Sequence, residues 1–101
     1  LYKGTKMTLP AEYVAIKSAI QSLSQYLSNY TKGSKFRVNC ICPGGILDGQ
    51  DKLFLKRYNS FAHSKGMLSP KDINGLTAFL CSDDSKYIRG QNIVIDDGFS
   101  L

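Results

Sequence analysis

Apolar residues recur at intervals of three and four positions between Pro10 and Lys32, which is the spacing of one face of an α-helix. Proline is favoured in the first turn of a helix and glycine just beyond its end, so Pro10 and Gly33 suit the two boundaries. The pattern therefore predicts a long amphipathic helix over Pro10–Lys32. Its apolar stripe consists of Ile16, Ala19, Ile20, Leu23, Tyr26, Leu27 and Tyr30.

Four shorter segments follow this helix. Lys35–Ile41 is a continuous, largely apolar run that indicates a strand of a buried parallel sheet, and Asn92–Ile95 indicates a second short strand. Between them, Asp51–Ser64 carries a weaker helical pattern, and Ser69–Cys81 begins with a Ser-Pro pair typical of a helix start. The order helix–strand–helix–helix–strand predicts an α/β fold in which a right-handed crossover joins a parallel pair of strands.

Composition narrows the class of protein. The chain has 101 residues, of which 43% are hydrophobic and 21% charged, so it suits at most one small globular domain. No apolar run approaches the roughly 20 residues that span a bilayer, and no signal peptide is visible, so we expect a cytoplasmic protein without membrane association. An odd number of cysteines in such a chain predicts reduced thiols.

Metal and nucleic-acid binding are not expected. One histidine and three scattered cysteines do not form a recognisable ligand set, and Cys40 and Cys42 are interpreted as small apolar residues on one face of a strand. The formal charge of +5 could suit nucleic acid or an anionic surface. However, the lysines are dispersed from Lys3 to Lys86, so we interpret them as a solvated surface.

The segment with the clearest chemistry is Glu12–Ala19, which places Tyr13 and Lys17 four residues apart and so on one face of the predicted helix. A phenol has an ordinary pKa of about 10 and is a poor base at neutral pH. An ammonium held about 4 Å away would favour the phenolate by roughly 4 kcal/mol, or about 3 pKa units, at an effective dielectric constant near 20. The spacing therefore predicts a tyrosine suited to general acid/base work on an alcohol or carbonyl.

The same Tyr-x-x-x-Lys spacing occurs at Tyr2 and Lys6, but its context differs. Gly4 lies between these two residues, and no helical pattern has begun at that point. Their side chains need not share a face, so we interpret both as ordinary loop residues. The helical context is therefore what distinguishes Tyr13 and Lys17.

Five motifs that follow one another along the chain carry a family resemblance. They are Tyr13-x-x-x-Lys17, Arg37-Val38-Asn39-x-x-x-Pro43-Gly44-Gly45-Ile46, Phe79-Leu80-Cys81-Ser82-Asp83, Ile88-Arg89-Gly90-Gln91 and Ile95-Asp96-Asp97-Gly98. In this order and at these spacings, they resemble the C-terminal part of the short-chain dehydrogenase/reductase family. The resemblance implies that residues 1–101 are the C-terminal fragment of a single Rossmann-like domain with a doubly wound parallel sheet. The glycine-rich turn that receives the cofactor pyrophosphate in this family has no counterpart here.

The resemblance also implies roles for particular residues. Tyr13 would exchange the hydroxyl proton while a hydride moves between a carbonyl/alcohol substrate and an NAD or NADP cofactor, and Lys17 would lower the pKa of the phenol and hold the nicotinamide ribose. Pro43 and Gly44 would shape the turn beneath the nicotinamide, and the Ile46 backbone amide would reach its carboxamide. Tyr13 would also contribute to binding the cofactor. The segment from Leu47 to Met67 would be the variable substrate loop that closes over the reactants.

The chain departs from the family pattern in several places. Leu47 and Asp48 stand where a carboxamide-binding threonine is common, and Asp96-Asp97-Gly98 replaces the usual Asp-Gly-Gly. No serine precedes Tyr13 to act as the family's catalytic serine, so we expect the 101-residue chain alone to be inactive. We interpret His63 as a surface or substrate-loop residue, because no carboxylate at helical spacing orients it.

Two further expectations concern substrate and assembly. Leu1–Thr8 and Pro43–Asp48 resemble members associated with flagellin modification and surface-sugar synthesis, which implies a sugar-like substrate. The family resemblance implies a homodimer or homotetramer, and the apolar helix predicts that the isolated chain self-associates. A non-catalytic interaction or oligomerisation module, or a truncated product, is the alternative hypothesis.

Overall fold

The computed structural model describes residues 8–101. In chain order, its elements are α1 (Ala11–Tyr30), β1 (Cys40–Pro43), α2 (Lys52–Asn59), the 3₁₀ helix η1 (Pro70–Ile73), α3 (Asn74–Cys81), the 3₁₀ helix η2 (Asp83–Ser85) and β2 (Asn92–Ile95). The two strands pair in parallel, with Cys40 opposite Asn92 and Pro43 opposite Ile95. The predicted order of elements and the parallel pair are therefore confirmed.

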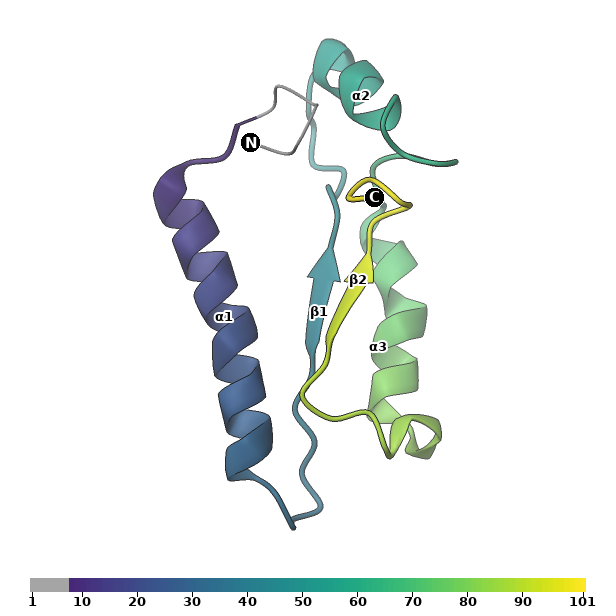
Figure 1. The fold of residues 1–101 in the computed structure, drawn as a ribbon. Helices are drawn as coiled ribbons and strands as arrows, with labels where there is room; N and C mark the ends of the chain where they lie inside the picture. Colours follow the sequence, from purple (N-terminus) through teal and green to yellow (C-terminus); the bar gives the residue numbers. More distant parts are fainter. Residues whose placement is uncertain (1–7) are drawn as a thin grey trace.

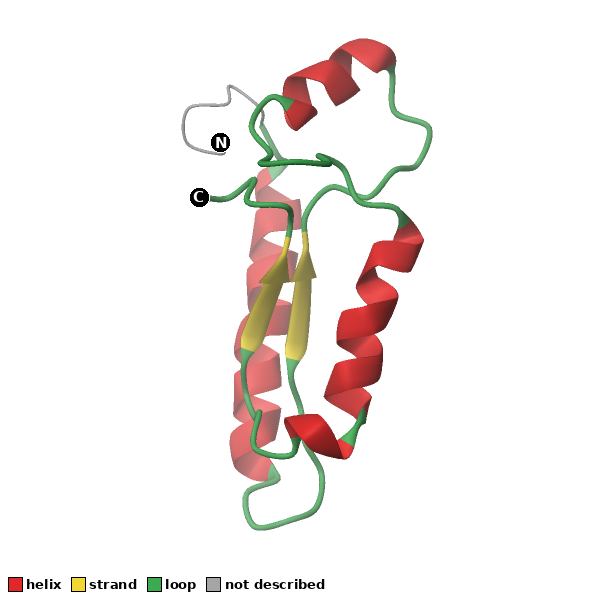
Figure 2. Cartoon of the chain, turned by 90° about the vertical axis from the view of Figure 1, so that its right-hand side faces the viewer, coloured by secondary structure: helices red, strands yellow, loops and turns green. Residues whose placement is uncertain are grey.

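The molecule is layered. The two-stranded sheet lies between α1 on one side and α3 on the other, and α2 lies beyond the carboxyl ends of the strands (Figure 1, Figure 2). Because the strands are parallel, both carboxyl ends lie at the same edge of the sheet. In open parallel sheets this edge is where ligands bind, so the turn after β1 and the loop after β2 are placed to form a site together.

The long helix forms nearly where its apolar spacing predicts it. It runs from Ala11 to Tyr30, one residue shorter at the start and two at the end than expected. Pro10 precedes the first turn, with a φ of −55° that suits a proline at this boundary. Beyond the helix, Gly33 has a φ of +84°, the left-handed conformation that glycine adopts without steric cost.

The first strand is displaced from its predicted position. It begins at Cys40 and not at Lys35, and it extends to Pro43, two residues beyond the expected end. The segment before Cys40 instead binds loops through its side chains: Arg37 donates to the backbone carbonyls of Ser82 at 3.1 Å and Ser85 at 2.9 Å. The length of β1 is set by its partner β2, which begins only at Asn92.

The middle helices are also shorter than expected. α2 ends at Asn59 and not at Ser64; it begins after Asp51, whose carboxylate accepts a hydrogen bond from the Phe54 N–H at 2.9 Å. The helix predicted over Ser69–Cys81 begins as η1 and becomes α-helical only at Asn74. The second strand, Asn92–Ile95, is confirmed at both ends.

The small apolar core lies beyond the carboxyl ends of the strands and not within the sheet. It comprises Tyr58, Met67 and Phe99, with Leu55 packed against it. The rings of Tyr58 and Phe99 stack with centroids 4.0 Å apart and planes inclined by 3°. This core joins α2 to the C-terminal segment and so holds the expected substrate loop at the carboxyl end of the sheet.

Candidate active site

The first turns of α1 hold the two residues with the clearest chemistry. Tyr13 and Lys17 share a face of the helix, and the Lys17 Nζ lies 5.4 Å from the centroid of the Tyr13 ring. Tyr13 is 47% exposed, so its ring lies at the surface of the described molecule and is accessible to a ligand. The prediction that these two side chains share a helix face is confirmed, and their roles stay predictions.

The turn after β1 brings the backbone close to its neighbours. The Gly44 N–H donates to the Ile95 carbonyl at 2.9 Å, which continues the sheet by one bond. A Cβ atom on Gly44 would lie 2.7 Å from the Cβ of Asp96, and one on Gly45 would lie 2.9 Å from the Cε2 of Tyr58. Any side chain at these two positions would clash, so both glycines are required sterically.

Ile46 is held by its backbone neighbours. It forms a parallel bridge with Leu68, the Leu47 N–H donates to the Leu68 carbonyl at 2.8 Å, and the side-chain amide of Gln50 donates to the Ile46 carbonyl at 3.0 Å. None of these bonds uses the Ile46 N–H, which is the group expected to reach a carboxamide. These bonds therefore orient the Ile46 peptide group and leave its N–H available for a ligand.

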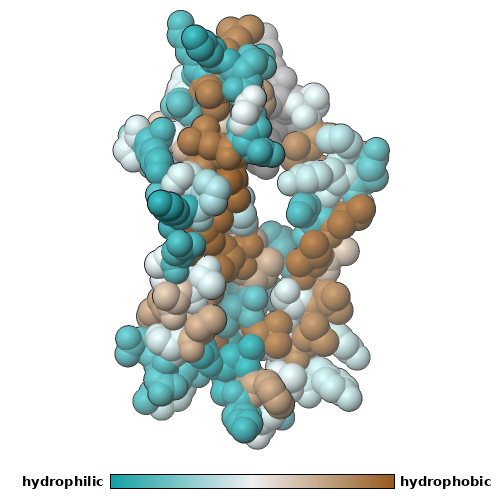
Figure 3. All heavy atoms as spheres, turned by 180° about the vertical axis from the view of Figure 1, so that it is seen from behind, coloured by the Kyte–Doolittle hydropathy of each residue, from teal (hydrophilic) through white to brown (hydrophobic). Residues whose placement is uncertain are grey.

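Two cavities meet at this turn. The helix-side cavity, of about 550 Å³, lies between α1 and β1. The loop-side cavity, of about 590 Å³, extends toward α2 and the C-terminal segment. Figure 3 shows the hollow between α1 and the rest of the molecule, with hydrophobic side chains on both of its sides. All five predicted site residues line the helix-side cavity: Tyr13, Lys17, Pro43, Gly44 and Ile46.

Several residues at the loop-side cavity were not predicted from the sequence. The Tyr58 hydroxyl accepts a hydrogen bond from the Gly45 N–H at 2.6 Å, and Asp96 accepts from the N–H groups of Gly98 at 3.0 Å and Ser100 at 2.9 Å. Both line the cavity, as do residues of the expected substrate loop. The sequence signals for Asp96 are its position directly after the second strand and its place in the motif Ile95-Asp96-Asp97-Gly98.

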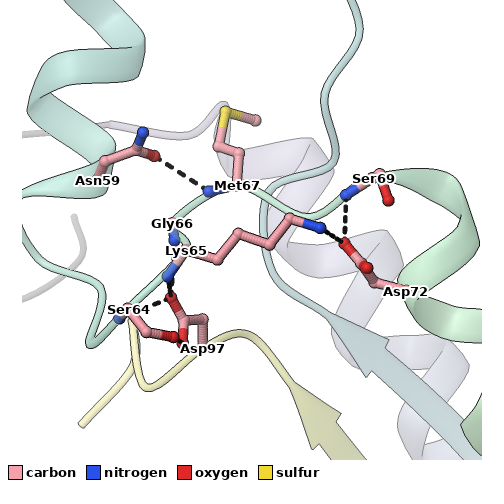
Figure 4. A network of polar contacts seen from close by, with 8 residues as sticks. All are labelled: Asn59, Ser64, Lys65, Gly66, Met67, Ser69, Asp72 and Asp97. Carbon is pink, nitrogen blue, oxygen red and sulfur yellow. Dashed lines mark hydrogen bonds and ion pairs between the residues drawn. The ribbon is translucent and has the colours of Figure 1, made fainter.

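Asp97 anchors the end of the expected substrate loop (Figure 4). Its carboxylate accepts hydrogen bonds from the Ser64 hydroxyl at 2.6 Å and from the backbone N–H groups of Ser64 at 3.0 Å and Gly66 at 2.7 Å. The Ser64 hydroxyl, followed by these N–H groups, holds the pKa of Asp97 well below its ordinary value. Asp97 also has a φ of +55°, a conformation that favours glycine and that aspartate tolerates.

Other candidates lie apart from the cavities. His63 lines neither of them and packs over Gly98, where an added Cβ would lie 2.6 Å from its ring. Within residues 8–101 no three His, Cys, Asp or Glu side chains gather in a way that could hold a metal ion. In the same range, no helix is both long and apolar enough to cross a bilayer. Tyr2 and Lys6 lie outside the described residues.

Comparisons with known proteins agree with the fold and the motifs. The family model described as enoyl-(acyl carrier protein) reductase matches residues 3–100. The post-translational flagellin modification protein A of Campylobacter coli is 43% identical over 100 residues, which cover 99% of this chain and 39% of that protein. The 7alpha-hydroxysteroid dehydrogenase of Bacteroides fragilis is 30% identical, over 88% of this chain and 36% of that protein.

Solved structures give the same result. A short chain dehydrogenase from Leptospira borgpetersenii with bound NAD+ superposes with a TM-score of 0.89 at 34% identity, over 99% of this chain and 41% of that one. A 4-hydroxyisoleucine dehydrogenase complexed with NADH and succinate superposes with a TM-score of 0.82 at 31% identity, over 95% and 42% of the two chains. The chain belongs to the short-chain dehydrogenase/reductase family, and it spans about two fifths of the length of these relatives.

Proposed function

We propose that this chain is the C-terminal part of an NAD(P)-dependent oxidoreductase acting on a carbonyl/alcohol pair, and that residues 1–101 belong to a single Rossmann-like domain. The observation that carries the proposal is the helix-side cavity, which is lined by the Tyr13–Lys17 pair and by the turn after β1. The helix-side cavity thus combines an acid/base group with a turn whose backbone a flat ligand can approach closely.

The proposed acid/base group is the phenol of Tyr13. It gives a proton to the substrate oxygen when a carbonyl is reduced and takes one from the hydroxyl when an alcohol is oxidised. The Lys17 ammonium, 5.4 Å from the ring centroid, stabilises the negative charge that the phenol oxygen carries after it has given up its proton. The exposure of Tyr13 to the cavity leaves room for substrate beside it.

The residues present fit a nicotinamide cofactor. Gly44 and Gly45 lack the side chains that would fill the turn, and the Ile46 N–H is free of the bonds that fix its neighbours. Lys17, Pro43, Gly44 and Ile46 would hold the nicotinamide end, with Lys17 donating to its ribose and Ile46 to its carboxamide. When bound, the cofactor would supply or accept the hydride.

For the substrate we propose a sugar-like carbonyl/alcohol compound. The support is the 43% identity to a protein named for the post-translational modification of flagellin. The loop-side cavity also presents both polar and apolar groups, including Gln50, Asp96 and Phe54. A polyhydroxylated substrate could bond to the first two and pack against the third.

The test is Tyr13→Phe in the longer parent enzyme. This change retains the ring and removes the proton donor, so we expect turnover to fall by about 10²- to 10⁴-fold while NADH affinity changes little. Turnover is followed by NADH absorbance with a panel of carbonyl compounds, and NADH affinity by calorimetry. A matched control is Tyr26→Phe, on the same helix but outside both cavities, which should retain full activity.

Near-normal turnover by Tyr13→Phe would reject the proposed acid/base role. The 101-residue chain is tested in parallel, because we propose that it is inactive and does not bind NADH by itself. Binding or turnover by this chain would contradict that part of the proposal. If the parent neither binds nor oxidises NADH, the interaction-module hypothesis would replace the enzymatic one.

A further inference from the structure

Strand β1 presents two thiols side by side. Cys40 and Cys42 are alternate residues of the strand, so their side chains share a face, and their sulfur atoms lie 3.9 Å apart. Both are half-buried free cysteines that line the helix-side cavity together with Tyr13 and Lys17. The proposed reaction uses neither thiol, so the pair is available for a separate role.

The thiol pair faces α1 and is held from that side. The side-chain amide of Gln21 donates a hydrogen bond to the Cys42 sulfur at 3.1 Å. This bond and the 3.9 Å contact between the two sulfurs place both of them in the space between the helix and the strand.

The spacing suits a shared bridging atom better than a disulfide. A disulfide requires about 2.05 Å between sulfurs, and alternate residues of an extended strand hold their Cα atoms about 6.6 Å apart, near the upper limit for such a bond. A trivalent arsenic atom carries a lone pair and is pyramidal, so two sulfurs bonded to it at about 2.3 Å with an angle near 100° lie about 3.5 Å apart. The observed 3.9 Å is about 0.4 Å longer than this value and far longer than a disulfide bond.

The surroundings favour a central atom that reacts with protonated thiols. Burial, followed by the neighbouring Cys42, raises the pKa of the Cys40 thiol, so this sulfur is largely protonated at neutral pH. A divalent cation needs deprotonated sulfur and usually more than two protein ligands, and residues 8–101 offer no third His, Cys, Asp or Glu at this point. A trivalent arsenical needs only the two thiols.

We propose that Cys40 and Cys42 form a chelating dithiol site for monosubstituted trivalent arsenicals, beside the Tyr13–Lys17 pair. In the binding step, each S–H bond breaks and each sulfur bonds to arsenic, while the arsenic-bound oxygen leaves with both protons as water. Arsenic stays trivalent, so no oxidant or reductant is required. The cavity of about 550 Å³ has room for the organic substituent.

The test uses phenylarsine oxide and the 101-residue chain, with binding measured by intact mass spectrometry. We expect one adduct per chain, with the mass of the phenylarsenic group less two hydrogens. This adduct should resist an excess of a monothiol and be removed by 1,2-ethanedithiol. Cys81→Ser, which removes the exposed third cysteine, is the matched control and should behave as the parent sequence does.

Cys40→Ser and Cys42→Ser each leave a single sulfur at the site. Since chelation gains from the second bond being intramolecular, we expect each variant to bind at least about a hundredfold more weakly. Circular dichroism of the variants checks that the helices are retained. Tight binding by either variant, or its loss in Cys81→Ser, would overturn the proposal.

A measurement on the unaltered chain covers the case in which a variant fails to fold. Phenylarsine oxide is added before iodoacetamide, and the alkylated cysteines are located by peptide mass mapping. We expect Cys40 and Cys42 to be protected together while Cys81 remains reactive. Alkylation of either β1 cysteine at its unprotected rate would overturn the proposal. Neither test depends on the proposed dehydrogenase activity, so the two proposals fail independently.

Discussion

The phenol oxygen of Tyr58 accepts a hydrogen bond from the backbone N–H of Gly45 at a distance of 2.6 Å. Tyr58 is only 6% exposed, and its ring stacks on Phe99. This bond connects α2, in the expected substrate loop, to the turn that we propose lies beneath the cofactor. The position of the loop and the shape of the turn are therefore coupled through one buried hydroxyl.

Removing this hydroxyl should destabilise the chain without disturbing the ring stack. Tyr58→Phe leaves the half-buried Gly45 N–H without its partner, which costs about 1 kcal/mol in the free energy of unfolding. The measurement is urea denaturation followed by circular dichroism. Tyr87→Phe, at a tyrosine that is 87% exposed, is the control and should change the free energy by less than about 0.5 kcal/mol. Equal losses in both variants would contradict the role assigned to Tyr58.

Two glycine substitutions should act in opposite directions. An alanine Cβ at Gly45 would lie 2.8 Å from the Met67 Cε and 2.9 Å from the Tyr58 Cε2, and the stacked Tyr58 ring has little room to move. Gly45→Ala should therefore lower the free energy of unfolding by about 1–3 kcal/mol. Gly75, in α3, has nothing within 4 Å of an added Cβ, so Gly75→Ala should raise it by about 0.5–1 kcal/mol. Stabilisation by Gly45→Ala would show that this turn tolerates a side chain.

The sequence predicts the features that depend on local spacing. The periodic stripe of α1 predicts the helix within two residues at either end, and the four-residue spacing then predicts that Tyr13 and Lys17 share a face. Features that depend on distant partners are predicted less well. The start of β1 is set by pairing with β2, more than forty residues later, and the apolar run alone does not contain that information.

The same reasoning explains the site residues that sequence analysis missed. Tyr58 is one aromatic residue in a weak helical pattern, and only the tertiary fold places its hydroxyl beside Gly45. Asp97 stands out in the sequence as a departure from Asp-Gly-Gly, and the structure supplies the physical reason for that departure. Its carboxylate bonds to Ser64 and Gly66, about thirty residues earlier in the chain.

Asp97 should make the anchored loop sensitive to acid. Because hydrogen bonds to the carboxylate lower its folded-state pKa, the folded state favours the charged form. The anchoring is complete above the unfolded pKa of about 3.9 and is lost as the pH falls through the lowered folded value. The backbone amide resonances of Lys65 and Gly66 should therefore shift on acidification below about pH 4 in an NMR titration.

Asp97→Asn tests this assignment directly. Asparagine tolerates the positive φ but cannot carry the charge, so the acid-dependent shifts of Lys65 and Gly66 should disappear. At neutral pH the loosened loop should also be cut faster by trypsin after Lys65. Asp84→Asn, at an exposed aspartate of η2, is the control and should leave both measurements unchanged. Persistence of the shifts in Asp97→Asn would assign them to another group.

The exposed face of α1 should drive association of the 101-residue chain. Ile16 and Leu23 lie two turns apart on this helix and are 61% and 54% exposed. Exposed apolar area of this kind is covered by another surface when one is available, and a second copy of the chain offers the same helix. We therefore expect oligomers at micromolar concentration in light scattering and sedimentation velocity.

A double substitution on this face should weaken the association. Ile16→Lys with Leu23→Lys replaces two apolar contacts by charges that repel across a symmetric interface, so the midpoint concentration should rise at least about tenfold. Ser18→Lys with Gln25→Lys adds the same charge at two exposed polar positions of α1 and should change it much less. A compact, stable monomer at micromolar concentration would show that the exposed apolar face of α1 does not drive association. Equal effects of the two double variants would assign the association to net charge and not to the apolar face.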